Sequence, residues 1–252
     1  PLVRRSARQI VQGRWLDPDA PRRGRWSAPE VDAYLDEVWT RVDELVPEAN
    51  LDELPTWGNR HNVYLAVVTT AAYQVLIERD VDREWAMELV GDMGWRVYRW
   101  LLKTVVEPIR LTSPDTATTI RRTLEALMVF PFDAPGAPGY EVEAWAEGDR
   151  YYTYWRHCPP EAFVRRLVEE GEDRGELEAF ARSWCLYDWA AADEFAADGR
   201  RGHYERPHTL SRGDDVCDMC WHAHPLADGA TPSETAPETS ASRGATRPRE
   251  AD

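Results

Sequence analysis

The residues of this chain best suited to chemistry are its cysteines and an aspartate close to one of them. Cys185 and Asp188 are three positions apart in a segment whose apolar residues have helical spacing, so both fall on the apolar face of the expected helix. Burying a carboxylate without partners costs several kcal/mol, so Asp188 must be hydrogen-bonded, ion-paired or in contact with a cavity. It is then either a structural acceptor or an acid, base or substrate-binding group beside a thiol.

A second candidate nucleophile, Cys158, comes directly after an aromatic run at residues 151–157. Strict alternation along a strand places it on the same face as Arg156. An arginine beside a thiol favours the thiolate, which is the nucleophilic form, whereas a free cysteine also serves as a small buried hydrophobe. Both interpretations of Cys158 stay open.

The last expected strand contains a Cys-x2-Cys pair followed by two histidines, which together supply four potential zinc ligands. In a strand, Cys217 and Cys220 face opposite sides, so they do not form a metal-binding knuckle. Cys220, His222 and His224 share one face, but three alternating neighbours fit one ion poorly. We therefore expect no metal or cofactor, and keep zinc bound by these last three residues as an alternative.

The N-terminal half offers Asn59 and Arg60 at the start of an expected buried helix. Amides and an arginine at a helix N-terminus suit a carboxylate ligand, because the free backbone N–H groups of the first helical turn also point toward such a ligand. Ordinary capping by Asn59 is the alternative.

The elements that must position these residues predict an α+β fold. Apolar spacing predicts a helical half over residues 28–130, with helices at 28–46, 59–80, 82–106 (ending before Pro108) and 113–130. The following residues are mixed: strands at 140–146 and 151–157 form one expected hairpin, and strands at 202–210 and 216–222 form a second. Helices are expected at 159–170 and 175–195. We expect the helical N-terminal half to pack on a small antiparallel sheet with two further helices.

The domain organisation predicted from composition has three parts. Residues 1–27 contain several turn signals and are expected to be an irregular extension. Residues 28–226 are expected to form a single domain, helical over 28–130 and mixed over 138–226. Residues 227–252 have almost no large apolar side chain and are predicted to be a disordered tail.

Composition excludes several classes of function. The formal net charge of −15 and a pI of about 4.9 disfavour nucleic acid and anionic membranes as partners. The sequence contains no apolar run of membrane-spanning length, no signal-peptide core and no nucleotide-binding glycine loop, His-Glu-x-x-His or Gly-x-Ser-x-Gly motif. We expect a cytoplasmic protein with free thiols that acts on a small molecule, in an oligomeric state that the sequence does not define.

The order of motifs in the C-terminal half resembles the L-2-amino-thiazoline-4-carboxylic acid hydrolase family. The matching pieces are Tyr154-Trp-Arg-His-Cys158-Pro, Gly175-Glu-Leu, Cys185-Leu-Tyr-Asp188 and Thr209-Leu-Ser-Arg-Gly-Asp-Asp-Val-Cys217-Asp218. The segment 59–103 is also similar to the family's N-terminal part, so the resemblance covers about residues 59–222. Met219 stands where the family pattern has an aromatic residue, and Cys220 and the histidines after it are not part of that pattern.

This resemblance implies a hydrolase that opens a C–N bond of a small cyclic amidine or thiazoline-type amino acid. A thiol would attack the amidine carbon, a carboxylate would hold the cationic amidine, and an arginine would bind the substrate carboxylate. The implied catalytic residues are Cys158, Cys185, Cys217 and Asp188, with Asn59, Arg60, Arg156, Arg206 and Asp218 as substrate-binding residues. Cys185 is favoured as the nucleophile because Asp188 is one turn away.

The closing strand is also similar to that of 4-vinyl reductase-like ligand-binding domains, which keeps a non-catalytic binding module as the alternative. The two hypotheses differ in geometry. The enzyme requires at least one cysteine and Asp188 to line the same cavity, whereas the binding module allows the thiols to be scattered through the core.

Overall fold

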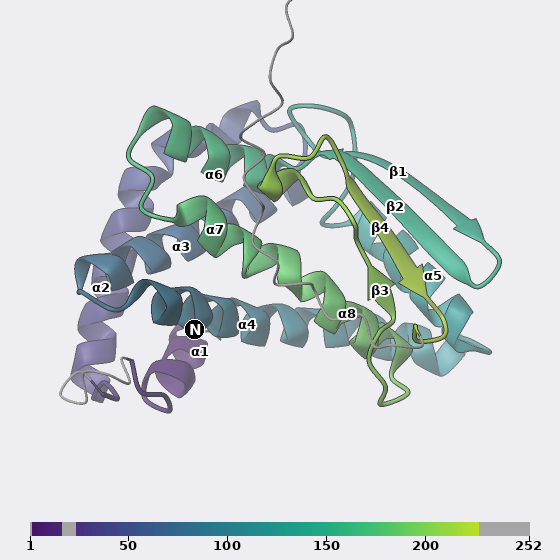
Figure 1. Cartoon of the computed structure of the whole chain (residues 1–252), viewed down its shortest axis with the longest axis horizontal. Coiled ribbons are helices and arrows are strands. Elements are labelled where there is room, and N and C mark those ends of the chain that lie inside the picture. The colour runs from purple at the N-terminus through teal and green to yellow at the C-terminus, as the bar shows by residue number, and fades with distance from the viewer. Residues whose placement is uncertain (1, 17–23, 227–252) are drawn as a thin grey trace, which may run out of the picture.

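Helices dominate the computed structural model, which describes residues 2–16 and 24–226 (Figure 1). Within these ranges, α-helices pack against one four-stranded antiparallel sheet, so the predicted α+β class is confirmed. The predicted disordered tail, residues 227–252, lies outside the described residues, and the prediction of a single domain over 28–226 stays a prediction. No helix in the described part of the chain has the length and apolar character needed to cross a membrane.

The α-helices follow the predicted order along the chain, with one helix more than expected at the N-terminus and one break near the C-terminus. They are α1 (Leu2–Val11), α2 (Ala28–Leu45), α3 (Trp57–Glu78), α4 (Arg83–Thr112), α5 (Thr116–Val129), α6 (Pro159–Glu170), α7 (Glu176–Ala181) and α8 (Tyr187–Ala196). Short 3-10 turns at 47–49, 51–53, 184–186 and 210–212 connect some of them.

The prediction that residues 1–27 are irregular is wrong for α1. Ala7 and Val11 lie one helical turn apart and are both fully buried. The Ser6 hydroxyl donates to the carbonyl of Met93 on α4 at 2.8 Å, which ties the two helices together. The turn signals that suggested an irregular segment begin only at residue 17, and residues 17–23 lie outside the described ranges.

Helix α3 is buried on several sides, as its nearly all-round apolar sequence predicts. It contacts α2, α4, α6 and α7. Its N-terminus is capped by Thr56, whose hydroxyl accepts from the backbone N–H of Asn59 at 3.1 Å. The N-cap considered from the sequence, Asn59, lies three residues after the observed N-cap, Thr56.

Helix α4 continues through Pro108, where the sequence predicted that it would end. Proline removes one backbone hydrogen bond, to the carbonyl four residues earlier. That residue, Thr104, is exposed, so water can satisfy its carbonyl, and the helix runs on to Thr112.

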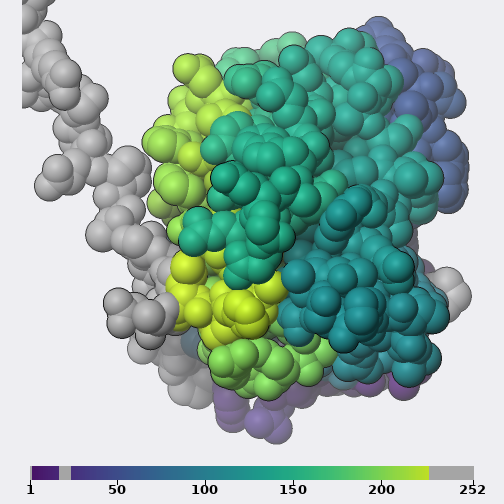
Figure 2. Space-filling view, turned by 90° about the vertical axis from the view of Figure 1, so that its right-hand side faces the viewer, coloured from purple at the N-terminus to yellow at the C-terminus, as the bar shows by residue number. Residues whose placement is uncertain are grey.

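The sheet has the strand order β1-β2-β4-β3, with every pair antiparallel. The strands are β1 (Glu141–Glu147), β2 (Arg150–His157), β3 (Tyr204–Glu205) and β4 (Cys217–His222). Both predicted hairpins exist, although β3 is much shorter than the expected strand over 202–210. Figure 2 shows the β1–β2 hairpin beside the yellow-green residues of β4 on one surface of the molecule.

The helix predicted over 175–195 is interrupted. Its N-terminal part ends at Ala181, and Ser183 adopts a non-helical backbone with φ −116° and ψ −83°. The Ser183 hydroxyl donates to the carbonyl of Ala179 at 2.6 Å, the local competition with backbone bonding for which serine is known. Cys185 then lies in a 3-10 turn and Asp188 in the first turn of α8.

Two apolar clusters form the core. One joins α1, α2, α3 and the first half of α4 with α6 and α7. The other joins the second half of α4 with α5, α8 and the inner face of the sheet, where Trp155, Cys217, Met219 and Trp221 point. The site described next lies where these two clusters meet.

Candidate functional site

A cavity of about 380 Å³ lies between the two apolar clusters, and side chains from both line it. A volume of this size is typical of pockets that hold a small organic ligand. Most of the wall is apolar, with Leu, Val, Met, Phe and Trp side chains. The polar and ionisable residues that reach it are His61, Asn62, Thr69, Tyr98, Thr104, Tyr140, Cys158, Glu161, Cys185, Tyr187, Asp188, Arg206, Ser211 and Cys217.

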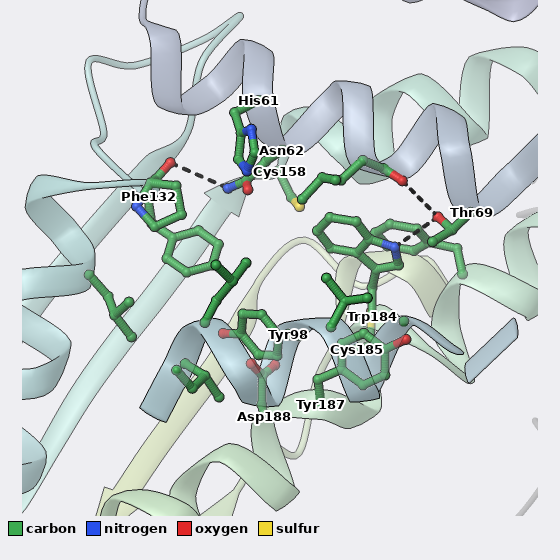
Figure 3. A pocket seen from close by; sticks show the side chains of 18 of the residues that line it. His61, Asn62, Thr69, Tyr98, Phe132, Cys158, Trp184, Cys185, Tyr187 and Asp188 are labelled. Atoms are coloured by element: carbon green, nitrogen blue, oxygen red, sulfur yellow. Dashed lines mark hydrogen bonds between the residues drawn. The ribbon is translucent and has the colours of Figure 1, made fainter. Parts of the chain in front are cut away.

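The four predicted catalytic residues all line this cavity. Cys158 comes from the start of α6, Cys185 and Asp188 from the segment around the start of α8, and Cys217 from β4. In Figure 3, Cys158 and Asn62 lie on one side of the cavity, and Tyr98 and Asp188 lie on the other. The geometric condition for the enzyme hypothesis, a cysteine and Asp188 at one cavity, is therefore met.

Asp188 is held by an ion pair with Arg206 in the cavity wall. Arg206 donates from Nη1 to Asp188 Oδ2 at 2.9 Å and from Nη2 to the carbonyl of Cys185 at 3.0 Å. The Tyr204 hydroxyl donates to the same carboxylate oxygen at 3.4 Å. The guanidinium also stacks over the Trp189 ring, 4.8 Å from its centroid.

This pair has two properties suited to ligand binding. The Arg206 side chain is only 4% exposed, and its Nε has no hydrogen-bond partner among the described residues. An unpaired buried N–H is costly, so a ligand that accepts from it gains free energy. Burial raises the pKa of Asp188 to about 6, against the opposing pull of Arg206, so this carboxyl titrates close to neutral pH.

A short chain of polar contacts connects two of the thiols. Cys185 Sγ lies 3.4 Å from the Ser211 hydroxyl, which lies 3.4 Å from the Thr209 hydroxyl. Thr209 Oγ1 in turn lies 3.4 Å from Cys217 Sγ, which also accepts the backbone N–H of Leu210 at 3.2 Å. Cys217 is therefore the thiol with the most hydrogen bonds that would stabilise a thiolate.

The thiols are nevertheless protonated at neutral pH in this structure. Burial raises the pKa of Cys185 to about 11 and that of Cys158 well above its usual value. Burial also raises the pKa of Cys217, while the positive charge of Arg206 opposes this rise at Cys185 and Cys217. Thiol chemistry here needs a group that removes the proton or a substrate that accepts it.

Cys158 and Arg156 do not share a face, contrary to the prediction from alternation. The strand ends at His157, and Cys158 is the N-cap residue of α6, where the chain leaves the sheet. Arg156 is 49% exposed on the outer face of the sheet and pairs with Glu143 at 3.5 Å. Alternation fails here because it holds only while the strand continues.

Three more predicted substrate-binding residues also lie away from the cavity. Asn59 donates to the carbonyl of Asp133 at 2.9 Å, and Arg60 donates to the carbonyl of Leu54 at 3.0 Å. Asp218 faces the opposite side of β4 from Cys217 and accepts from both the backbone and the ring of His208 at 2.7 Å. Of the five predicted substrate-binding residues, only Arg206 is at the site.

Sequence reasoning missed several polar residues of the cavity. Asn62, one turn after Asn59, donates to the Tyr140 hydroxyl at 2.9 Å, and Glu161 bonds Arg165 at 2.8 Å while it lines the wall. Tyr98 on α4 also lines the wall, opposite Cys158 and Asn62 (Figure 3). Asn62 offered a signal in the sequence, because it is a buried-type position one turn after Asn59 in a largely apolar helix.

A separate cluster of metal-binding side chains lies on the outer face of the sheet. The ligand atoms of Glu205, Cys220 and His222 all lie within 4.8 Å of one another. The alternative zinc set named from the sequence had His224 in place of Glu205. His224 lies after the end of β4 and is exposed, so the alternation that would align it with His222 has stopped.

Comparison of the chain with protein-family models, with curated proteins and with solved structures finds no match in any of the three.

Proposed function

We propose that this chain is a small-molecule hydrolase that opens a C–N bond of a cyclic amidine or thiazoline-type amino acid in the cavity beside Asp188. One observation carries the proposal: three cysteines, Asp188 and Arg206, drawn from separate segments of the chain, line one cavity of ligand size. The motif resemblance of the C-terminal half supports the choice of substrate class.

The ionisable groups suit the two ends of such a substrate. Asp188 can hold the positively charged amidine, and its pKa of about 6 lets it release and accept a proton near neutral pH. Arg206 has one unpaired N–H that can bind the substrate carboxylate. The apolar remainder of the wall excludes water from the polar end, which strengthens both contacts.

The covalent route needs water as its only co-reactant. The thiol of Cys217 adds to the amidine carbon while its proton passes to the ring nitrogen, and the C–N bond then breaks to free an amine. Water attacks the same carbon, expels the thiol with its proton restored, and leaves a carbamoyl group on the product. We assign the attack to Cys217, rather than to the Cys185 favoured from spacing, because Leu210 N–H and Thr209 both contact its sulfur.

Four free cysteines are consistent with a reducing compartment, and we propose that the protein acts in the cytoplasm. Side chains of this protein can bind the small molecule in the cavity, and we propose that the reaction uses no resident cofactor. We also propose that neither nucleic acid nor a membrane is a partner.

A non-catalytic ligand-binding module is the second candidate. The mainly apolar wall and the protonated thiols favour it, because a binding site needs neither an activated nucleophile nor a water. In that case the Asp188–Arg206 pair would anchor one polar group of the ligand.

The test is to incubate the purified chain with L-2-amino-thiazoline-4-carboxylic acid and follow ring opening by mass spectrometry. In buffer that contains a metal chelator, we expect turnover by the parent chain and loss of turnover in Cys217→Ala and Asp188→Asn. Cys220→Ala, whose thiol faces away from the cavity, should turn over the compound like the parent chain. Turnover in Cys217→Ala but not in Cys185→Ala would move the nucleophile to Cys185. If the parent chain and its variants are folded and bind the compound but none of them opens its ring, the chain is a binding module.

A further inference from the structure

The outer face of the sheet brings together three side chains of the types that bind zinc. Glu205 on β3 is the register partner of Cys220 on β4, and His222 is two positions further along the same strand. Residues two apart on a strand point to the same side, so Cys220 and His222 project together beside Glu205. The sheet register, rather than a flexible loop, sets this arrangement.

The separation of the three donor atoms fits a tetrahedral ion. Ligand bonds of 2.0–2.3 Å place the donors of such a site roughly 3.3–3.8 Å apart. His222 Nε2 lies 3.1 Å from Glu205 Oε1, and all three donors lie within 4.8 Å of one another. Small side-chain rotations are therefore enough to enclose a metal.

The charge and accessibility of the cluster also suit a divalent cation. A thiolate, a carboxylate and a neutral imidazole together carry two negative charges, which match one Zn²⁺. His222 is 4% exposed and Cys220 is buried, whereas Glu205 is 42% exposed, so the site is open on one side only. Arg150, the register partner of His222, places a positive charge nearby, but its exposed side chain can move into solvent.

The backbone around the cluster is fixed by hydrogen bonds. The N–H of His222 donates to the carbonyl of His203 at 2.8 Å, and His203 Nδ1 lies 2.9 Å from the carbonyl of His222. His203 is fully buried and also contacts Asp198 at 3.2 Å. Pre-positioned ligands lose less conformational entropy when a metal binds, which raises affinity.

From these observations we infer that Glu205, Cys220 and His222 form a binding site for a single zinc-type divalent ion, with water at the fourth position. This site is separate from the cavity and does not depend on the proposed function. It would join the two-residue strand β3 to β4, and Arg206 directly follows its ligand Glu205. A bound ion would therefore stabilise the segment that places Arg206 beside Asp188.

Cobalt titration of the chelator-treated full chain tests the site, because Co²⁺ takes zinc positions and its bond to a thiolate gives a near-ultraviolet absorption band. We expect this band at one Co²⁺ per chain, its displacement by Zn²⁺, and a higher melting temperature with Zn²⁺. Binding to the thiol should also release a proton.

Matched variants separate this site from the cavity thiols. Cys220→Ser should remove the absorption band, whereas Cys217→Ser, on the same strand but the opposite face, should retain it. Glu205→Gln changes a partly exposed residue without altering its size, so it should fold normally and weaken binding by about tenfold or more. His224→Ala should bind like the parent chain. No cobalt band in the parent chain, or an unchanged band in Cys220→Ser, would overturn the proposal.

Discussion

Strand β4 has two faces with opposite surroundings, and each carries a cysteine. Cys217 points into an apolar cavity, where its sulfur is bonded by Thr209 and by the backbone of Leu210. Cys220, three residues later, points to the outer face and meets Glu205 and His222. The same residue type is thus placed beside hydrogen-bond donors on one face and beside metal-type ligands on the other, and only strand alternation separates the two roles.

The chemistry of a cysteine in this protein therefore follows from its neighbours. On the inner face, the charged neighbours Asp188 and Arg206 neutralise each other and leave a binding surface for an organic molecule. On the outer face, the donor atoms of Glu205, Cys220 and His222 lie within 4.8 Å of one another, and the nearby Arg150 has an exposed side chain that an added ion can displace. Single substitutions can therefore change one face and leave the other intact.

The largest effect is expected from Arg206→Ala. This change removes the partner of Asp188 from a buried pair, so the free energy of unfolding should fall by about 3–5 kcal/mol, measured by urea denaturation. Arg156→Ala is the matched control, because Arg156 forms an exposed pair on the outer face and should change stability by less than about 1 kcal/mol. Equal losses in the two variants would contradict the buried pair.

The next effect is a pH dependence that belongs to Asp188. Burial raises its pKa from 3.8 to about 6, so between these pH values the folded chain keeps a proton that the unfolded chain has released. The free energy of unfolding therefore falls as the pH rises from about 4 to about 6, by up to about 3 kcal/mol. Denaturation at several pH values should show this slope in the parent chain and a flatter one in Asp188→Asn. The same slope in both would show that another group titrates.

Thiol protection should distinguish the two faces directly. Alkylation mapped by mass spectrometry reports each cysteine separately. Zn²⁺ at about ten times its dissociation constant should slow modification of Cys220 about tenfold and leave the three cavity cysteines unchanged. A cavity ligand should do the reverse. Protection of Cys217 by zinc, or of Cys220 by the cavity ligand, would show that the faces are not independent.

The smallest effect is expected from Thr153→Val on the inner face of β2. Thr153 is fully buried and accepts from Trp221 Nε1 at 3.1 Å, so its replacement leaves a buried donor unpaired. We expect a loss of about 1–2 kcal/mol in thermal or urea unfolding. Glu143→Ala on the outer face removes only an exposed ion pair and should cost less than about 1 kcal/mol. A larger loss in Glu143→Ala than in Thr153→Val would reverse the expected order.

Local sequence patterns predicted much of the fold because they depend on neighbouring residues. The helical spacing over 28–130 and the alternation at 140–157 gave the correct elements, and the opposite faces of Cys217 and Cys220 follow from strand geometry alone. The same logic failed where an element ended, as at Cys158 after β2 and at Ser183 within the helix predicted over 175–195. A pattern does not show where the chain will turn.

Residue spacing alone was enough to predict an α+β protein in which Cys185 and Asp188 occupy apolar positions. Only the tertiary structure decided that residues far apart in the sequence share one cavity, and that Arg206 rather than Arg60 or Arg156 stands there. It also placed Glu205, not His224, beside the outer cysteine. The physical reason is that periodicity fixes which way a side chain points from its own element, whereas its partners depend on how distant elements pack and on sheet register.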